Sequence, residues 1–175
     1  MDDIVRTERL HIIPNSAEDL RFALDKGFEA AAASRGLTLP AMERKERRMR
    51  RSIYSVKLDL MRDYPNAHKL CTAWQIVLPE FNVIIGEMGF KGPPTMGSVE
   101  IGYGLHPDCR RMGYMTEAVA AMCTYAFTQE AYKVDRVVAL TRWRNKASQG
   151  VLLKNGFTRK GWHSLWLMRW EKASD

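Results

Sequence analysis

The segment of residues 105–119, LHPDCRRMGYMTEAV, is where residue types and spacing point most clearly to chemistry. A predicted strand ends here and a predicted helix begins, so the first N–H groups of that helix lack partners and carry partial positive charge. Gly113 lets the backbone approach a ligand without a Cβ in the way. Arg110 and Arg111 add fixed charge and fork-shaped donors that suit phosphate. The segment therefore predicts a phosphate or diphosphate site held mainly by backbone amides.

The same segment also fits a tight strand-to-helix turn with two solvated arginines, because a single glycine is a weak signal. The net charge of +7 favours an anionic partner, which could be nucleic acid, an acidic protein or a phosphorylated small molecule. Charge alone does not choose among these partners.

Length and composition predict one soluble globular domain over residues 1–175, since 46% of the residues are hydrophobic. No apolar run reaches the length of a membrane span, and the N-terminus MDDIVRTERL has no apolar core or cleavage site, so we expect a cytoplasmic protein without a membrane partner. Cys71, Cys109 and Cys123 lack metal-ligand spacing and leave an odd thiol, which suits a reducing compartment. No metal site is predicted.

The N-terminal elements must place this segment within a sheet. RLHII predicts a first strand, and Ser16 is predicted to cap a short helix with Asp19 as its partner. Residues 28–63 are predicted to be mostly helical, with a break near GLTLP. From residue 42 onward the apolar positions recur at helical spacing and predict an amphipathic helix with an apolar stripe, made of Met49, Ile53, Val56 and Leu60.

The remaining elements predict a mixed sheet with helices on its faces. KLCTAWQIVL and NVIIGEMGF are predicted as a hairpin joined at residues 79–82, and VEIGYGL as a further strand that ends before Pro107. A helix follows, with its apolar face on Met115, Ala118, Val119, Met122, Tyr125 and Ala126. VDRVVALT is a predicted strand, NKASQGVLLKN a helix ended by Gly156, and TRKGW and SLWLMRW are closing strands.

Three stretches resemble the GNAT superfamily of acyl-CoA-dependent N-acetyltransferases: GEMGF, VEIGYGLHPDCRRMGYMTEA and NKASQGVLLKNGF, in this order and separation. Together with TERLHIIPNSAEDL, they resemble especially the branch of ribosomal-protein N-terminal (RimJ/RimL-like) acetyltransferases, over nearly the whole chain except residues 26–69. The resemblance implies an α+β GNAT fold with a mixed, mostly antiparallel central sheet of about six or seven strands flanked by about four helices. It also implies acetyl-CoA as the cofactor.

The resemblance places the coenzyme A diphosphate on the amides of residues 111–115, because the signature Arg/Gln-x-x-Gly-x-Gly/Ala falls on Arg110, Gly113 and Met115. Met115 departs from the usual small residue, so its side chain should either turn into the core or narrow the cleft and weaken binding. The residues expected to contact the coenzyme are Leu105, His106, Arg110, Arg111, Met112, Gly113, Tyr114, Met115, Thr116, Asn145 and Lys154.

Three of these contacts lie away from the diphosphate. The strand end at Leu105 and His106 resembles the edge that pairs with the pantetheine arm. Asn145 matches a residue that hydrogen-bonds the arm, but Asn is also a favoured N-cap, and both roles can hold. Lys154 could reach the adenosine end or could simply be a solvated lysine.

The resemblance also suggests acid–base residues, since transfer needs a neutral amine and a proton for the departing thiolate. Glu100 is the first candidate base, acting directly or through water, with a solvated carboxylate as the alternative and Glu87 as the reserve. Many relatives place a tyrosine acid where this chain has Leu152. Ser148 is the available hydroxyl and matches a serine of the ribosomal-protein branch, although it could also be an ordinary first-turn serine.

The acceptor is less well specified by the sequence. Residues 26–63 would wall its site, and Arg44, Arg47, Arg48 and Arg51 would line one side of a helix there, either solvated or docking an acidic protein or RNA. The tryptophans Trp162, Trp166 and Trp170 recur with strand period, so some should pack in the core or between two copies of the chain, and at most one in the cleft. The short closing hairpin predicts an open cleft, which would suit a peptide N-terminus, a small amine or an antibiotic.

The sequence thus predicts an N-acetyltransferase that moves an acetyl group from acetyl-CoA to a primary amine by direct attack in a ternary complex. One alternative is a weakly catalytic acyl-CoA-binding regulatory module, which Met115 and Leu152 would support. The other is a basic RNA-associated protein, ranked last because no RNA-recognition motif is visible.

Overall fold

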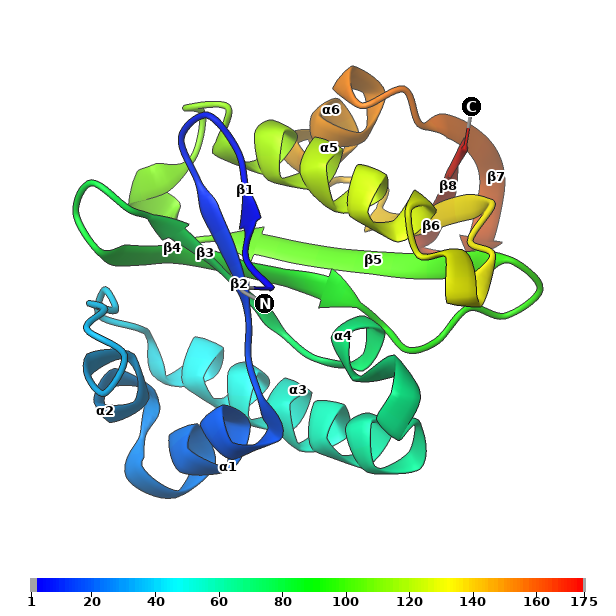
Figure 1. Ribbon diagram of the computed structural model, residues 1–175. Coiled ribbons are helices and arrows are strands. Elements are labelled where there is room, and N and C mark those ends of the chain that lie inside the picture. Colours follow the sequence, from blue (N-terminus) through cyan, green and yellow to red (C-terminus); the bar gives the residue numbers. More distant parts are fainter. Residues whose placement is uncertain (1–2, 175) are drawn as a thin grey trace.

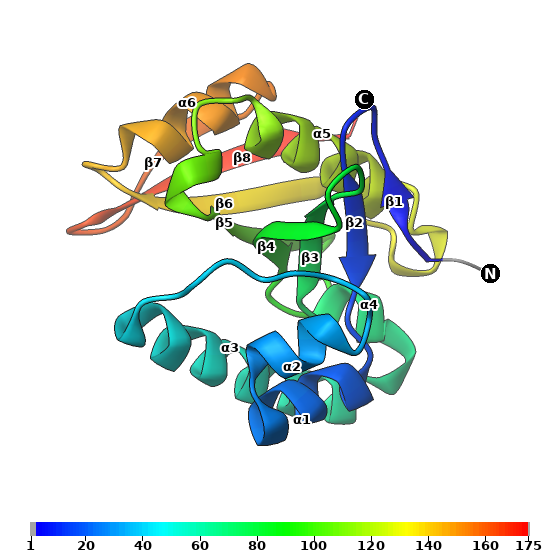
Figure 2. The same ribbon diagram turned by 90° about the vertical axis from the view of Figure 1, so that its left-hand side faces the viewer.

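The computed structural model describes residues 3–174, in which eight strands form one sheet and six α-helices cover its two faces (Figure 1). The strand order is β1-β2-β3-β4-β5-β6-β8-β7. Helices α5 and α6 lie on one face and α1 to α4 on the other (Figure 2). The predicted fold class is confirmed, with one or two more strands and two more helices than expected. No helix within the described part of the chain combines the length and apolar character needed to cross a membrane.

The N-terminal elements follow the predicted order with two corrections. Their bounds are β1 Val5–Arg6, β2 His11–Pro14, α1 Ala17–Lys26, α2 Phe28–Ala33, α3 Arg44–Asp63, η1 Pro65–Ala67 and α4 His68–Cys71. The predicted cap is confirmed, because Ser16 Oγ accepts from Asp19 N at 3.0 Å and the Asp19 carboxylate accepts from Ser16 N at 2.8 Å. The strand predicted at RLHII is β2, which begins at His11, two residues later than predicted, and it is preceded by a short strand, β1, that was not predicted. The start of KLCTAWQIVL is helical rather than extended.

The predicted hairpin of β3 (Trp74–Leu78) and β4 (Val83–Phe90) is confirmed, and β5 (Ser98–Leu105) continues it antiparallel to β4. The register between β3 and β4 shifts, since Ile76 pairs with Gly86 but Val77 pairs with Ile84. The extra β4 residue between these pairs, Ile85, accepts a hydrogen bond from His106 N at 2.8 Å. This bulge ties β4 to the residue that follows β5.

The C-terminal half alternates helices and strands as predicted. Its elements are η2 Pro107–Cys109, α5 Tyr114–Phe127, η3 Glu130–Tyr132, β6 Arg136–Arg142, α6 Lys146–Lys154, β7 Thr158–Ser164 and β8 Leu167–Ala173. Gly156, at φ 77°, ends α6 in the left-handed conformation, and Phe157 N donates to Leu152 O at 3.0 Å. Strand β6 pairs parallel with β5 and antiparallel with β8.

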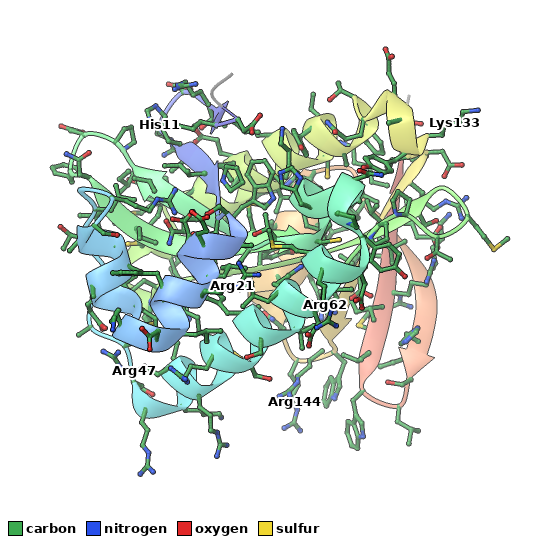
Figure 3. All side chains as sticks on the ribbon, turned by 60° about the horizontal axis from the view of Figure 1, so that its bottom comes forward. His11, Arg21, Arg47, Arg62, Lys133 and Arg144 are labelled. Atoms are coloured by element: carbon green, nitrogen blue, oxygen red, sulfur yellow. The ribbon has the colours of Figure 1, made fainter. Side chains whose placement is uncertain are left out.

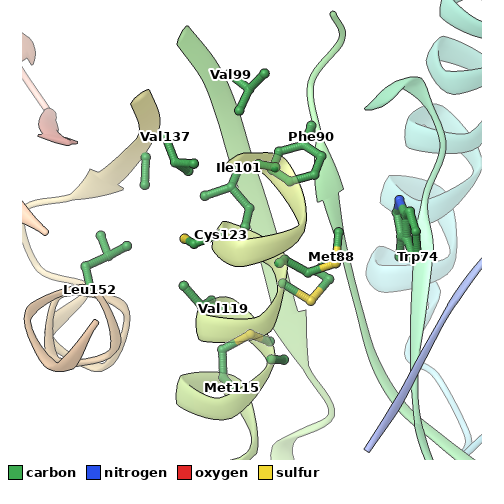
Figure 4. Packing of buried hydrophobic residues seen from close by; sticks show 14 of the residues in the cluster. Trp74, Met88, Phe90, Val99, Ile101, Met115, Val119, Cys123, Val137 and Leu152 are labelled. Atoms are coloured by element: carbon green, nitrogen blue, oxygen red, sulfur yellow. The ribbon is translucent and has the colours of Figure 1, made fainter. Parts of the chain in front are cut away.

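The face under α5 and α6 carries the main apolar core (Figure 4). The predicted α5 face is confirmed, since Ala118, Val119, Met122 and Ala126 are all fully buried. Leu152 of α6 is also fully buried against this cluster. Fully burying an apolar side chain of this size contributes about 1.5–3 kcal/mol, so this face is a principal source of stability.

The opposite face is built differently, and here the predicted stripe of α3 is misplaced. The helix itself is confirmed, but the side packed on the sheet consists of Arg50, Tyr54, Lys57 and Met61. Met49, Ile53 and Val56 are 60%, 41% and 55% exposed. The buried charges are tolerated because Arg50 pairs with Glu87 and Lys57 donates to the carbonyl of Phe90.

The predicted arginine side of α3 is partly structural. Arg47 pairs with Glu29 of α2, and Arg51 Nη1 donates to Leu24 O of α1 at 2.8 Å. Two of the four predicted arginines therefore fasten α3 to α1 and α2. The apolar stripe lies on the other side of α3, toward the loop after β4, where a Cβ built on Gly92 would be 3.8 Å from Leu60 Cδ2.

Candidate active site

The neighbouring strands β5 and β6 pair over their first residues and then separate. Parallel pairing of β5 with β6 covers Ser98, Val99 and Glu100, and β5 then continues to Leu105 while β6 turns toward β8. Lys91 N donates to Glu100 O at 2.8 Å, so the backbone groups of Glu100 point toward β4. Because backbone direction alternates along a strand, those of residues 101, 103 and 105 point into the gap beside β6. This open edge can pair with an extended ligand.

The predicted pantetheine edge falls partly on this gap. Leu105 lies at its mouth, where its carbonyl accepts from Arg110 Nη2 at 3.3 Å and Nε at 3.4 Å. The N–H of His106 already donates to Ile85 O of β4, so this donor is not available to a ligand. Arg110 therefore holds the loop after β5 against the end of that strand.

The loop between β5 and α5 has the backbone that an anion site needs. Arg111 and Gly113 both adopt the left-handed conformation, with φ 66° and 81°, and α5 begins directly afterwards at Tyr114. Gly113 is its N-cap residue and carries no capping side chain, so the first N–H groups of α5 remain available to a ligand. A left-handed arginine is strained by roughly 1–3 kcal/mol, which is characteristic of functional loops.

Met115 does not enter this loop. Its side chain is buried in the core cluster under α5 (Figure 4). Of the two outcomes expected for this long side chain, the structure shows the one in which it turns into the core. Met115 therefore does not block the loop over residues 111–113. The neighbouring Thr116 carbonyl accepts from Asn155 Nδ2 at 3.2 Å, which fixes the start of α5 against the end of α6. These residues fit a bound diphosphate.

The start of α6 brings two hydroxyls together beside the gap. Asn145 Oδ1 accepts from Ser148 N at 3.1 Å, which is the capping role considered for it. Ser148 Oγ donates to Tyr103 Oη at 2.9 Å. Burial raises the pKa of Tyr103 to about 12, so this phenol stays protonated at neutral pH. Tyr103 was not predicted as a site residue, although the alternation of VEIGYGL places it on the α5 and α6 side.

Lys154 lies in the last turn of α6 with its side chain exposed. Its contact with an adenosine stays a prediction. Cys109 beside the loop is partly buried, while Cys71 and Cys123 are buried, and all three thiols are free.

Two carboxylates occupy the face of the sheet opposite Tyr103. Glu100 forms an ion pair with Lys91 at the point where β5 and β6 separate. Glu87 of β4 pairs in register with Gly104 of β5 and lies beside Tyr54 Oη and 3.3 Å from Arg50 Nε. Burial raises the pKa of Glu87, opposed by Arg50 and Tyr54.

Between these carboxylates the strand presents bare backbone. Gly102 and Gly104 point to the same face as Glu100, because side chains two residues apart share a face. A Cβ built on Gly104 would meet nothing within 4 Å, and one on Gly102 would reach only Lys91 Cε at 3.8 Å. We call Gly102 and Gly104 the glycine floor.

Comparison with protein families identifies the family to which this chain belongs. The family described as "Acetyltransferase (GNAT) domain" matches residues 9–158, which is most of the chain. The chain belongs to the GNAT acetyltransferase family.

Curated relatives of this GNAT chain match it over part of their length. The uncharacterized N-acetyltransferase YjdG of Bacillus subtilis (strain 168) is 36% identical over 93 residues, covering 53% of this chain and 54% of the relative. YoaA from the same organism is 32% identical over 89 residues, covering 50% of this chain and 49% of the relative. The chain thus spans about half the length of the curated relatives it matches.

Solved structures share the GNAT fold over nearly the full chain. RimL, described as a ribosomal L7/L12 alpha-N-protein acetyltransferase and solved with coenzyme A, has a TM-score of 0.69 at 15% identity, covering 99% of both chains. The ribosomal-protein-S5-alanine acetyltransferase from Vibrio fischeri has a TM-score of 0.67 at 16% identity, covering 99% of this chain and 98% of that one. At these identities the likeness concerns the fold.

Two elements of the GNAT chain carry exposed apolar side chains. One is α3 with its apolar stripe, and the other is the tip of the β7–β8 hairpin, where Trp162, Leu165 and Trp166 are exposed. Figure 3 views this side and shows Arg144 projecting between α3 and the hairpin. Its guanidinium lies 4.6 Å from the ring centre of Trp143. Of the three predicted tryptophans, Trp170 is the one in the core, with Nε1 bonded to Thr141 Oγ1 at 2.9 Å.

Proposed function

We propose that this chain transfers an acetyl group from acetyl-CoA to the amino terminus of a polypeptide by direct attack in a ternary complex. The observation that carries the proposal is the separation of β5 from β6, with the uncapped start of α5 at its mouth, a hydroxyl pair on one face and a carboxylate on the other. Family membership supports the reaction class.

The chain's own residues divide the binding of the coenzyme. The amides of residues 111–116 would hold the diphosphate at the start of α5, and the edge of residues 101–105 would pair with the pantetheine arm. Asn145 and Lys154 would contact the arm and the adenosine end. When bound, acetyl-CoA supplies the activated thioester. Structural neighbours solved with coenzyme A, or with acetyl-CoA and AMP, support this choice.

Glu100 and the hydroxyl pair have opposite tasks in the reaction. As the amine nitrogen bonds to the acetyl carbon, its proton passes to Glu100, directly or through water. The C–S bond then breaks. Tyr103 Oη donates to Ser148 O at 3.3 Å while it accepts from Ser148 Oγ, so its O–H would turn from that carbonyl to donate to the departing sulfur. A proton from solvent would then replace the one that passes to the thiolate. Glu87 is the less suitable base, because Arg50 and Tyr54 already contact its two oxygens.

The glycine floor and the exposed apolar side chains of α3 and the hairpin support a polypeptide acceptor rather than a small polar amine. Met49, Ile53 and Val56 leave an apolar surface on α3 in contact with water, which a peptide side chain could cover. The closing hairpin turns through Leu165 and Trp166, so it leaves the cleft open. Structural neighbours whose names refer to ribosomal proteins support the same acceptor class.

The two alternative functions have less support. A weakly catalytic module was suggested by Met115 and Leu152, but Met115 packs in the core and Tyr103 supplies a hydroxyl where Leu152 supplies none. An RNA-associated protein was suggested by the arginines of α3, of which Arg47 and Arg51 hold neighbouring helices.

Calorimetric titration with acetyl-CoA tests the coenzyme site. The unaltered protein should bind with a Kd near the micromolar range, and Gly113→Glu should weaken binding by about 100-fold or more, since it places bulk and negative charge in the proposed diphosphate site. Gly36→Glu is the matched control, because Gly36 is also left-handed, at φ 69°, but lies between α2 and α3. Thiol release with short peptides and with small amines then tests the acceptor class. Absence of acetyl-CoA binding, or turnover confined to small amines, would contradict the proposal.

A further inference from the structure

The turn between β1 and β2 reaches the proposed coenzyme loop from a distant part of the sequence (Figure 1). The turn is closed by its own hydrogen bonds, from Thr7 N to Leu10 O at 2.9 Å and from Leu10 N to Thr7 Oγ1 at 3.0 Å. It presents Arg9 toward the start of α5. None of the roles proposed above uses this residue.

Glu117, in the first turn of α5, anchors Arg9. Its Oε1 accepts from Thr7 Oγ1 at 2.5 Å and from Arg9 N at 2.9 Å, and its Oε2 accepts from Arg9 Nε at 2.7 Å. Arg9 Nη2 lies 2.7 Å from the same Oε2, so both guanidinium nitrogens meet one carboxylate oxygen while the backbone N–H of Arg9 meets the other. These charge-assisted contacts together hold Arg9 in place. Burial raises the pKa of Glu117, but the hydrogen bonds from Thr7 and Arg9 outweigh it and leave this pKa below its usual value.

From this anchor, Arg9 contacts Met112 in the loop and Tyr114 at the start of α5, and lies close to Gly113 between them. Its Nη1 donates to Met112 O at 2.9 Å, and its guanidinium carbon lies 4.7 Å from the ring centre of Tyr114. A Cβ built on Gly113 would come within 3.3 Å of Arg9 Nη2. The guanidinium therefore lies directly against one side of the loop.

The bond to Met112 O sets the direction of a loop amide. In a trans peptide the C=O and the following N–H point to opposite sides. Holding the Met112 carbonyl toward Arg9 therefore directs the N–H of Gly113 away from Arg9. This peptide can rotate about ψ of Met112 and φ of Gly113, and glycine restricts that rotation little because it has no Cβ. The bond from Arg9 therefore opposes a rotation that the local backbone permits.

We infer that Arg9, anchored by Glu117, is a positioning residue for diphosphate binding, which holds the peptide between Met112 and Gly113 with its N–H toward the ligand. The inference rests on the proposed coenzyme site. It predicts a selective effect. Ligands that carry the diphosphate should depend on Arg9, and a pantetheine thioester without one should not.

The experiment compares two acetyl donors in the full-length protein. Arg9→Met should raise the Kd for coenzyme A by about 10-fold or more, while kcat/KM with S-acetylpantetheine should change by less than about twofold. Arg9→Lys, which keeps the charge but loses the fork, should restore part of the affinity. Glu117→Gln should weaken coenzyme binding by about 3- to 10-fold, because the anchor loses its charge.

Arg136→Met is the matched control. Its side chain is 41% exposed against 42% for Arg9, it also pairs with an acidic residue, and it lies at the opposite end of β5 and β6. This variant should match the unaltered protein with both donors.

Three outcomes would overturn the inference. Unchanged coenzyme affinity in Arg9→Met shows that the contact does not position the loop. Equal losses with both donors show a general structural role. If Arg9→Met does not fold, unchanged coenzyme affinity in both Arg9→Lys and Glu117→Gln shows instead that the contact does not position the loop. Failure of the unaltered protein to bind coenzyme A would instead overturn the proposed function, and this inference with it.

Discussion

The two faces of the sheet are built by opposite rules. Under α5 and α6 the buried side chains are mostly apolar, and Met115, Met122 and Leu152 close the core. The buried polar side chains of this face are uncharged, namely Thr141, Gln149 and Asn155. Under α3 the buried side chains include Arg50, Lys57 and Glu87, while apolar side chains of the same helix face outward. The first face holds the proposed coenzyme loop and the second holds the proposed acceptor floor. The comparison indicates that the part of the site which meets a fixed cofactor is supported by dry packing, and the part which meets a variable acceptor by paired charges.

The physical cost of the two arrangements differs. Dry packing gains free energy from every buried apolar group. A buried ion pair loses hydration and is rarely a net source of stability. The α3 face is therefore expected to contribute less to stability, and under the proposed function an acceptor would cover the exposed part of its apolar stripe, Met49, Ile53 and Val56.

The largest effect is expected from Met115→Ala on the dry face. Removing this buried side chain should lower the free energy of unfolding by about 2–5 kcal/mol, through lost transfer energy and the cavity that remains. The Kd for coenzyme A should change by less than about twofold, because Met115 points away from the loop. Denaturant unfolding and calorimetry measure both quantities, with Met96→Ala as control, because Met96 is exposed and lies outside the proposed coenzyme site. A tenfold change in coenzyme affinity would contradict the packing described here.

A comparable effect on stability is expected from the titration of Lys57, on the sheet-facing side of α3. Burial lowers the pKa of Lys57 to about 8, from 10.5 for an ordinary lysine. Between these values the unfolded chain binds more protons than the folded chain, so stability should rise with pH from about 8 to 10.5, by at most about 3 kcal/mol. Below pH 8 both states are protonated and this contribution is flat.

Lys57→Met should remove this rise and make the protein more stable at pH 7. Unfolding by urea at a series of pH values measures it. If the stability of Lys57→Met rises with pH as much as that of the unaltered protein, the rise comes from other titratable groups.

The next effect concerns turnover. Glu100→Gln should reduce kcat by about 100-fold, equivalent to about 2.7 kcal/mol, and leave the Kd for coenzyme A unchanged. Glu87→Gln should act mainly on stability, because it weakens the interaction with Arg50. Steady-state rates from pH 5 to 9 separate the two carboxylates. Unchanged turnover of Glu100→Gln across this range would exclude Glu100 as the base.

The smallest effect is expected from Ile53→Ser on the exposed stripe. Stability should stay within about 0.5 kcal/mol, since the side chain has few partners to lose. The KM for a peptide acceptor should rise by about 3- to 10-fold, whereas Arg48→Ser elsewhere on α3 should have no such effect. An unchanged peptide KM would remove α3 from the acceptor site.

Local signals in the sequence predicted much of the fold. The Ser16 cap, the end of α6 at Gly156 and the apolar side of α5 are all properties of short segments, and all are confirmed. The orientation of α3 was not predictable in this way. Periodicity shows that a helix has an apolar side, but Arg50 and Lys57 face the sheet because their partners come from β4, which is distant in sequence.

The site shows the same division. The loop at Gly113 and the cap at Asn145 follow from local spacing. The Tyr103–Ser148 pair joins two elements 45 residues apart, so it needs the tertiary structure to be seen. Arg9 is further still, at 103 residues from the carbonyl it holds.

The glycine floor has a consequence for how this chain can diversify. A methyl group added at Gly104 would touch nothing within 4 Å, and the backbone there is not left-handed. Replacement by alanine or serine would thus leave folding almost undisturbed while altering the surface on which the proposed acceptor would rest. If that proposal holds, a single codon change at this position would alter acceptor choice without any compensating change for stability elsewhere.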